Sequence, residues 1–293
     1  MLLRSMLFVP AHNKKFIDKA LESDADAIIL DMEDSVPENS KVIARKIIGE
    51  YAQSNKFEKH TVFIRTNPLE EPQILKDIEA GSHVTITGFM PPKISSEGDI
   101  LFLERLLEQQ EMERGISNGH FKLAPLVETT AAVLNLTEIV RHSKRTVAIC
   151  FGGEDYLNDL QGIHGTPPKA FDVPRALIAM AARSVGIEPI DTPFLNLKDE
   201  KGFIREKKEA YELGFSGSLL INPKQIKDAN NCFKPNDDEV QQAINIIDAI
   251  KKSKELGDGC VMLGNQMIGP PMQRKAEQIM KLIKMIEEKK VRK

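Results

Sequence analysis

Several short apolar runs in this 293-residue chain are followed by charged side chains that could take part in chemistry. These residues are Asp31, Glu33, Asp34, Arg65, Lys93, Glu128, Glu154 and Asp155. Carboxylates that converge without a nearby His or Cys suit a hard cation, Mg²⁺ or Mn²⁺, which binds oxygen ligands and keeps several waters. An Arg beside such a metal suits a substrate carboxylate or a developing oxyanion. The expected chemistry is metal-assisted enolate formation or carbon–carbon bond cleavage next to a carbonyl.

These charged residues would meet if the apolar runs were strands of one parallel barrel. The predicted strands are residues 2–9, 27–30, 61–65, 84–89, 122–126, 146–151, 188–191 and 218–221. They alternate with amphipathic segments, which is typical of parallel strands with helical crossovers. Eight strand–helix units over about 250 residues predict an α/β fold of the (β/α)8 TIM barrel type. The active site of such a barrel lies at the carboxyl ends of the strands. A doubly wound open sheet is the alternative, but no Gly-x-Gly-x-x-Gly follows a predicted strand.

The segment after the last strand–helix unit is an addition to the predicted barrel. A short strand at residues 261–267 precedes Pro270-Pro271 and a helix that ends near residue 289. The predicted domains are therefore a catalytic barrel over residues 1–255 and a C-terminal arm and helix over residues 256–293. We expect the extension to pack on the barrel or on a neighbouring subunit, which favours a homo-oligomer.

Each charged residue also has a purely structural interpretation. The acidic residues after the second strand could cap the helix expected from about residue 37. Glu128 and Asp155 stand at predicted helix starts, where the helix dipole favours an acid, and Arg65 could be an ion-pair partner. It is the coincidence of Arg65, Glu128 and Asp155 at strand ends that favours a functional site.

Composition and charge argue against other classes of protein. The chain has 40 Lys and Arg against 43 Asp and Glu, so its net charge of −3 gives no reason to expect nucleic acid. The apolar runs are shorter than the ~20 residues of a membrane span, and the first ten residues are typical of a strand rather than a signal peptide. Cys150, Cys232 and Cys260 form no CxxC or Cys/His cluster. We therefore expect neither a zinc site nor disulfides, and a cytoplasmic protein.

The histidines show no metal-ligand spacing, and most are expected in loops or at the surface. They are His12, His60, His83, His120, His142 and His164. Of these, His12 and His164 lie nearest to the predicted rim of the barrel.

Sequence motifs spread along most of the chain resemble the citrate lyase β-subunit family, within the HpcH/HpaI group of aldolases and lyases. In order, they are RSMLFVPAHN, AIILDMEDSV, FIRTNP, PPKISS, LVETTAAV and FGGEDY. The resemblance implies a (β/α)8 barrel that forms a homotrimer or homohexamer and uses Mg²⁺. It also implies cleavage or formation of citryl-, malyl- or citramalyl-thioesters. The partners would be a thioester of coenzyme A or an acyl carrier protein, and a 2-oxo acid.

The resemblance assigns roles to the charged residues at matching positions. Glu128 and Asp155 resemble the two metal-ligand carboxylates of the family. Arg65 resembles the arginine that contacts the substrate carbonyl. Asp31 and Glu33 match the acidic motif near the metal waters, so these two and Arg65 are the predicted catalytic residues.

Further matches concern substrate binding, and two positions depart from the family pattern. Lys93 matches a lysine after the fourth strand, and Gly152 and Gly153 would let the backbone approach the ligand closely. Gly269 stands where the family's C-terminal arm has an aspartate, a catalytic acid/base delivered from a neighbouring subunit. Asn222 stands where the family has a histidine. Neither residue can transfer a proton, and general acid–base assistance is worth about 10²–10⁴-fold.

Three functions are compatible with this pattern. The leading hypothesis is a Mg²⁺-dependent lyase that cleaves a 3-hydroxyacyl thioester into a 2-oxo acid and a thioester enolate. The second is a metal-dependent aldolase that acts on 4-hydroxy-2-oxo acids without a thioester. The third is a ligand-binding or regulatory homologue that has lost catalysis with the aspartate at Gly269.

Overall fold

The computed structural model describes residues 1–163, 165, 169–256, 261–264 and 266–291. His164 and Cys260 of the sequence analysis lie outside the described residues. The chain forms two compact units, the first with residues 1 and 3–233 and the second with residue 2 and residues 234–293. This division falls earlier in the chain than the predicted boundary between residues 255 and 256, which stays a prediction.

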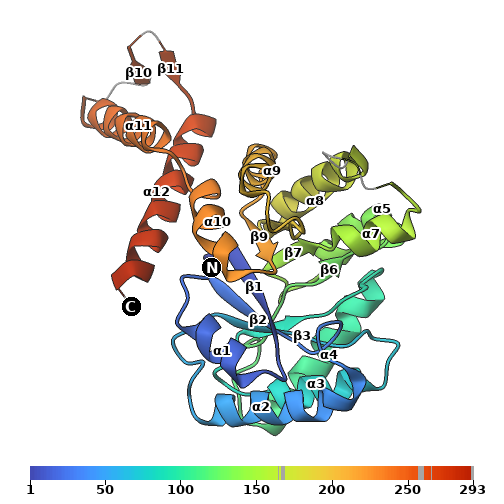
Figure 1. The fold of residues 1–293 in the computed structure, drawn as a ribbon. Helices are drawn as coiled ribbons and strands as arrows, with labels where there is room; N and C mark the ends of the chain where they lie inside the picture. Colours follow the sequence, from blue (N-terminus) through green and yellow to red (C-terminus); the bar gives the residue numbers. More distant parts are fainter. Residues whose placement is uncertain (164, 166–168, 257–260, 265, 292–293) are drawn as a thin grey trace. The chain divides into compact units, whose positions relative to one another are not determined.

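The first unit is built on a parallel sheet whose outer face is covered by helices (Figure 1). Its strands are β1 (Ser5–Pro10), β2 (Ala27–Asp31), β3 (Val62–Arg65), β4 (Gly88–Met90), β5 (Lys122–Leu123), β6 (Leu126–Val127), β7 (Ala148–Phe151), β8 (Glu188–Asp191) and β9 (Gly217–Leu220). The order in the sheet is β5-β4-β3-β2-β1-β9-β8-β7-β6. Each pairing between neighbours in this order is parallel.

The two edges of this sheet belong to the same stretch of chain, so the sheet closes on itself. β5 and β6 are halves of one strand that is interrupted at Ala124-Pro125, because proline has no N–H to donate. On the β4 side, the Ala124 N–H donates to the Phe89 carbonyl (2.9 Å). On the β7 side, the Cys150 N–H donates to the Pro125 carbonyl (3.0 Å). The prediction of a (β/α)8 barrel is therefore confirmed.

Helices follow the strands around the barrel, because parallel neighbouring strands need a crossover connection. They are α1 (Lys14–Leu21), α2 (Lys41–Gln53), α3 (Gln73–Gly81), α4 (Glu97–Glu113), α5 (Thr130–Leu134), α6 (Leu136–Arg141), α7 (Gly153–Asp159), α8 (Asp172–Val185), α9 (Glu200–Glu212) and α10 (Ile226–Cys232). Short 3-10 turns are η1 (Glu38–Ser40), η2 (Lys169–Phe171) and η3 (Pro223–Gln225). The helix expected from about residue 37 is thus η1 followed by α2.

Alternation along the strands divides the buried side chains into two cores. Strand residues such as Ile28 and Ile64 pack with helix residues in the larger core. Their neighbours Ile29 and Phe63 belong to a second core, which is made of barrel residues and fills the interior. Because side chains alternate with a period of two, the residue two positions after an interior residue points the same way.

This alternation places polar residues at the mouth of the barrel, just beyond the interior core. The interior residue and the residue two positions later are Ile29 and Asp31, Phe63 and Arg65, Leu126 and Glu128, and Cys150 and Gly152. All of these pairs run toward the carboxyl ends of parallel strands. The fold therefore gathers the predicted site residues from separate parts of the sequence at one end of the barrel.

The second unit is a pair of helices joined by a β-hairpin. Its elements are α11 (Asp237–Leu256), β10 (Val261–Leu263), β11 (Gln266–Ile268) and α12 (Pro270–Val291). Ile246, Ile250, Ile268 and Ala276 contribute to its apolar core. The prediction of one strand over residues 261–267 is wrong, because β10 and β11 pair antiparallel and Gly264 between them has a positive φ of 59°. In the described part of the chain, no helix has the length and hydrophobicity to cross a membrane.

Candidate active site

Asp31 and Arg65 form a bidentate ion pair at the mouth of the barrel. They lie opposite each other at the ends of β2 and β3. Arg65 donates from Nε to Asp31 Oδ1 and from Nη2 to Oδ2, both at 2.7 Å. Asp31 also accepts the backbone N–H groups of Glu33 (2.9 Å) and Ser35 (3.1 Å). Burial raises the pKa of Asp31, but Arg65, the Ser35 side chain and the N–H of Glu33 outweigh it and hold the pKa below its usual value.

Arg65 is fixed by further contacts of its guanidinium group. Its Nη1 lies 3.0 Å from Glu33 Oε2 and 3.2 Å from Asp34 Oδ2. The guanidinium also stands 4.8 Å from the centre of the Phe8 ring, which comes from the interior face of β1. Arg65 is therefore a preorganised positive charge at the mouth, held by carboxylates on one side and an aromatic ring on another.

Glu33 lies between the two cationic side chains of the site. Its Oε2 is near Arg65, and its Oε1 is 3.2 Å from Lys93 Nζ. Burial is the main cause of a raised pKa at Glu33, and the charge of Asp34 adds to it, while Arg65 and Lys93 oppose it. Of the two predicted catalytic acids, Glu33 is thus the one whose proton affinity is shifted toward neutral pH.

Lys93 contributes through its backbone as well as its ammonium group. It follows β4 and the pair Pro91-Pro92, and it has a positive φ of 54°. In this conformation its N–H donates to Glu128 Oε1 at 2.8 Å. A left-handed conformation costs a non-glycine residue on the order of 1–3 kcal/mol and is concentrated at functional sites. The loop between β4 and α4 therefore orients the carboxylate of Glu128.

Glu128 is a buried carboxylate, 2% exposed, directly after β6. Among the described residues, the N–H of Lys93 is the hydrogen-bond donor to this carboxylate. A Cβ on Gly152 would lie 2.6 Å from both Cβ and Oε2 of Glu128, so only glycine leaves the carboxylate its present position. Burial, and then the negative charges of Glu33 and Asp155, raises the pKa of Glu128 to about 8.

Gly153 and Asp155 lie at the start of α7. The N–H of Gly153 donates to Thr192 Oγ1 at 2.9 Å, and a Cβ there would come within 2.6 Å of the same oxygen. Asp155 is exposed in the first turn of α7, near enough to Glu128 to raise the pKa of that residue. Gly152 and Gly153 thus make room for Glu128 and Thr192, and their contact with a ligand stays a prediction.

The donors at the mouth fit a divalent cation with oxygen ligands. Carboxylates outnumber cationic side chains there. Asp31, Glu33 and Asp34 pair with Arg65 or Lys93, and the charge of Asp155 acts on Glu128. Asp31 is neutralised by Arg65, whereas Glu128 is buried without a cationic side chain in contact among the described residues. A buried carboxylate surrounded by other negative charges is stabilised when it binds either a proton or a metal ion. The assignment of Glu128 and Asp155 as the metal ligands stays a prediction.

The two positions that depart from the family pattern have structural roles of their own. The Asn222 side chain accepts the backbone N–H of Lys224 at 3.0 Å and so caps η3. Gly269 separates β11 from α12, and its carbonyl accepts the N–H groups of Met272 and Gln273. A Cβ on Gly269 would meet only Pro271, at an ordinary 3.6 Å. The second unit therefore has room for a side chain at this position.

His12 is a rim residue to which the sequence analysis gave no role. It follows β1, and its Nδ1 is buried without a hydrogen-bond partner among the described residues. A buried polar atom without a partner is rare, and at a barrel mouth it suits contact with water or a ligand. The sequence alone carries no signal for this, because the burial of one atom depends on the folded loops around it.

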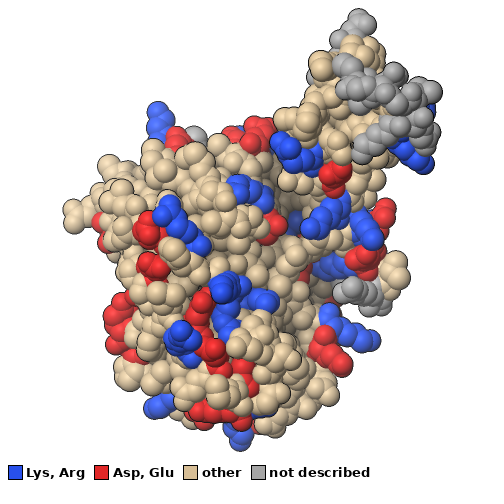
Figure 2. Space-filling model, turned by 180° about the vertical axis from the view of Figure 1, so that it is seen from behind, with Lys and Arg blue, Asp and Glu red and all other residues tan. Residues whose placement is uncertain are grey.

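On the face drawn in Figure 2, Lys and Arg side chains are interspersed with Asp and Glu. This mixture of signs matches the small net charge of −3. Asp31, Glu33 and Glu128 of the barrel mouth differ from such surface residues because they are buried.

The chain is similar to known proteins over most of its length. The model of the family described as HpcH/HpaI aldolase/citrate lyase matches residues 4–223. Citrate lyase subunit beta of Leuconostoc mesenteroides subsp. cremoris is 34% identical over 281 residues, which cover 96% of this chain and 93% of the relative. L-malyl-CoA/beta-methylmalyl-CoA lyase of Rhodobacter capsulatus is 29% identical over 303 residues, with 96% and 95% covered.

A solved structure is similar in both fold and sequence. It is the citrate lyase beta subunit from M. tuberculosis, complexed with oxaloacetate and magnesium. The TM-score is 0.66 and the identity 26%, over 80% of this chain and 100% of that one. The residues matched by the family model, 4–223, include every residue of the barrel mouth from Asp31 to Asp155.

Proposed function

Because the chain is a lyase that belongs to the HpcH/HpaI aldolase/citrate lyase family, we propose that it cleaves or forms the carbon–carbon bond of a 3-hydroxyacyl thioester with Mg²⁺. Substrates of this class are citryl-, malyl- and citramalyl-CoA, and acyl carrier protein is the alternative thioester carrier. The names of the citrate lyase and malyl-CoA lyase relatives support this class. The magnesium and oxaloacetate in the similar solved structure support the metal and the 2-oxo acid product.

The observation that carries the proposal is the environment of Glu128. This buried carboxylate is oriented by the N–H of Lys93, kept in place by the absence of a side chain on Gly152, and surrounded by other acids. We propose that Glu128 and Asp155 hold Mg²⁺. The bound ion would polarise the oxygens of the hydroxy-acid end and lower the cost of negative charge that develops there.

The other residues of the mouth would act on the substrate directly. Arg65 uses its Nε and one Nη2 N–H on Asp31 and its Nη1 on Glu33 and Asp34, which leaves an Nη2 N–H for a carbonyl or carboxylate oxygen. Asp31 is then a positioning residue, because it holds the guanidinium in one orientation. Lys93 is half exposed and supplies a second cation for a substrate carboxylate.

Glu33 is the proposed base in the cleavage direction. Its pKa is raised by burial, so it can accept a proton from the substrate hydroxyl more readily than Asp31, whose pKa is lowered. As the hydroxyl proton moves to Glu33, the C–O bond gains double-bond character and the adjacent C–C bond breaks. Its electron pair enters the thioester as an enolate, and protonation of the enolate carbon completes the acyl thioester.

The test is an assay of each CoA thioester with Mg²⁺ and with EDTA, in which release of the 2-oxo acid is measured. We expect turnover of at least one of citryl-, malyl- and citramalyl-CoA, its loss with EDTA, and its loss in Glu128→Ala. Turnover that survives both chelation and Glu128→Ala would contradict the mechanism. Condensation of pyruvate with an aldehyde in the absence of any thioester would favour the aldolase hypothesis instead.

Gly269 favours a second candidate function. With no ionisable group at this position, a homologue that binds metal and a thioester without rapid turnover is the alternative. Such a protein would bind Mg²⁺ and a CoA thioester in calorimetry but release no 2-oxo acid. We also propose a homotrimer or homohexamer, which sedimentation of the full chain would test.

A further inference from the structure

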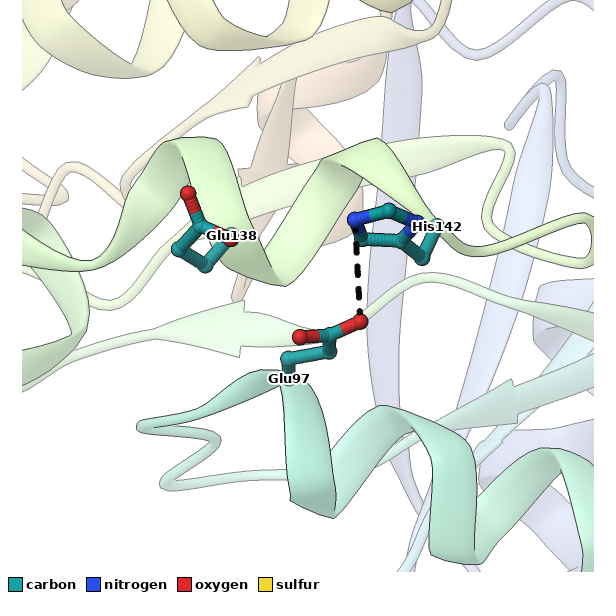
Figure 3. A group of neighbouring side chains, drawn as sticks. All are labelled: Glu97, Glu138 and His142. Atoms are coloured by element: carbon teal, nitrogen blue, oxygen red, sulfur yellow. Dashed lines mark ion pairs between the residues drawn. The ribbon is translucent and has the colours of Figure 1, made fainter.

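A second group of metal-ligating side chains lies in the outer helix layer of the barrel unit. Glu97 comes from the first turn of α4, Glu138 from α6, and His142 from the end of α6. One ligand atom of each lies within 4.8 Å of the other two. Figure 3 shows His142 and Glu138 on successive turns of one helix, with Glu97 across from them. Among the described residues, this is the group of three or more His, Cys, Asp or Glu side chains whose ligand atoms all lie this close together.

The spacing of two of these residues is that of a helical chelate. Glu138 and His142 are four positions apart, so they project from the same side of α6. Spacing among the histidines alone does not reveal this pair, because its second ligand is a glutamate. The third ligand, Glu97, is distant in sequence, and only the packing of α4 against α6 brings it to the same place.

The backbones that carry these ligands are tied together on both sides of the group. Before α6, the Asn135 side chain donates to the Ser95 carbonyl at 3.1 Å. After α6, Glu104 Oε1 accepts the Ser143 hydroxyl (2.8 Å) and the Lys144 N–H (3.0 Å). The two helices are thus cross-linked by hydrogen bonds next to Glu97 and next to His142. Such fixed backbones reduce the entropy lost when a metal gathers the three side chains.

We propose that Glu97, Glu138 and His142 form a binding site for a divalent transition-metal ion of the Zn²⁺ type. Ligand atoms of a tetrahedral zinc site stand about 3.3 Å apart when metal–ligand distances are about 2.0 Å. His142 Nε2 and Glu97 Oε1 are already 3.7 Å apart. The side chains are half exposed or exposed, so small rotations can close the remaining gap, and water would complete the coordination.

The chemistry of the ligands selects the class of ion. An imidazole nitrogen with two carboxylates suits Zn²⁺, Co²⁺ or Ni²⁺, whereas Mg²⁺ prefers oxygen ligands alone. This separates the proposed site from the predicted metal ligands of the barrel mouth, Glu128 and Asp155, which offer only carboxylate oxygens. A transition metal bound between α4 and α6 would also cross-link these helices and raise the melting temperature by mass action.

The competing explanation is a set of surface ion pairs. His142 faces Glu97, and Arg141 Nη1 lies 3.6 Å from Glu138 Oε1. Exposed pairs of this kind contribute little to stability, so they do not by themselves account for the convergence of three ligands. The ion pair of Arg141 with Glu138 allows a further test of the proposed metal site, because Arg141 would compete with a metal for the Glu138 carboxylate. Replacing Arg141 with alanine should therefore strengthen metal binding.

The experiment is calorimetric titration of the full-length protein with Zn²⁺ in a buffer that contains millimolar Mg²⁺, which occupies oxygen-only sites. We expect binding to the wild type, an affinity at least about tenfold weaker in His142→Gln and Glu97→Gln, and tighter binding in Arg141→Ala. Glu113→Gln is the matched control, because Glu113 is an exposed acid at the far end of α4. It should bind Zn²⁺ like the wild type.

Melting temperatures provide a second measurement on the same proteins. Zn²⁺ should raise the melting temperature of the wild type and of Glu113→Gln, and should not raise that of His142→Gln. Melting without added metal checks that each variant folds. Absence of Zn²⁺ binding to the wild type, or equal binding to the wild type and His142→Gln, would overturn the proposal.

Discussion

The carboxylate of Glu128 occupies space that any side chain on Gly152 would take, with Oε2 only 2.6 Å from the position of a Cβ. Gly152 lies directly after β7 and Glu128 directly after β6, so two neighbouring strands determine this contact. The glycine is required for the position of a neighbouring acid, and this explains its place in the motif FGGEDY better than a role in backbone flexibility does.

We therefore expect Gly152→Ala to weaken Mg²⁺ binding by about 10–100-fold, the range seen when support of a metal ligand is removed. Calorimetry with Mg²⁺ measures this directly. Gly49→Ala is a matched control, because an added Cβ at Gly49 in α2 contacts nothing within 4 Å. Unchanged Mg²⁺ affinity in a folded Gly152→Ala protein would show that Glu128 is not a ligand or that its position is not critical.

Mg²⁺ binding should also depend on pH through Glu128. Burial and the charges of Glu33 and Asp155 raise its pKa to about 8, so below pH 8 the carboxyl group carries a proton that a metal must displace. We expect the dissociation constant for Mg²⁺ to rise as pH falls from 8 to 6, by up to about tenfold per unit for one proton. Above pH 8 the affinity should level off.

Titrations at several pH values in buffers of different ionisation enthalpy would count the protons that Mg²⁺ releases. Glu128→Gln is the control, because the amide has no proton to lose at these pH values. If the variant kept both the affinity and the pH dependence of the wild type, another group would have to be the ligand that titrates.

Much of this site followed from the sequence because parallel strands with a period of two leave little freedom. Once AIIL and TVFI are strands, Asp31 and Arg65 must lie at the same end of the sheet. The same reasoning applies to Glu128 after β6. What the pattern could not show is that Asp31 binds Arg65 in a bidentate pair, because a strand pattern places Cα atoms and does not pair side chains.

Other features depend on backbone conformation or on distant packing. The positive φ that aims the N–H of Lys93 at Glu128 is unusual for a lysine and has no sequence signal. The hairpin turn at Gly264 has no clear sequence signal, because a glycine inside a short apolar run is compatible with one strand as well as with two. The group of Glu97 and His142 requires two helices to pack, and residue spacing cannot show this.

Lys207 is a buried cation that should stabilise the barrel next to the site. It is fully buried, and its Nζ contacts Asp191 Oδ2 (2.7 Å), Glu206 Oε1 (2.9 Å) and the carbonyl of Thr192 (2.7 Å). Removing one partner of a buried ion pair costs about 3–5 kcal/mol. We expect Lys207→Met to lower the free energy of unfolding by about that amount in urea denaturation.

The matched control for this change is Lys208→Met, because Lys208 is the next residue of α9 and is exposed. Its effect should stay within about 0.5 kcal/mol. Equal stability of Lys207→Met and the wild type would mean that Arg175, which also pairs with Asp191 and Glu206, neutralises both acids alone.

Restoring an acid at Gly269 tests whether the missing proton-transfer group limits catalysis. The position accepts a side chain, since an added Cβ meets only Pro271 at 3.6 Å. It also precedes α12, where aspartate and asparagine both suit the N-cap, so neither should destabilise the second unit. We expect Gly269→Asp to increase kcat for cleavage of the preferred CoA thioester, within the ~10²–10⁴-fold range of general acid–base assistance.

Gly269→Asn separates proton transfer from capping, because its amide can cap the helix but cannot ionise. A gain in kcat with aspartate alone would assign proton transfer to this position, whereas an equal gain with asparagine, or none with either, would contradict that role.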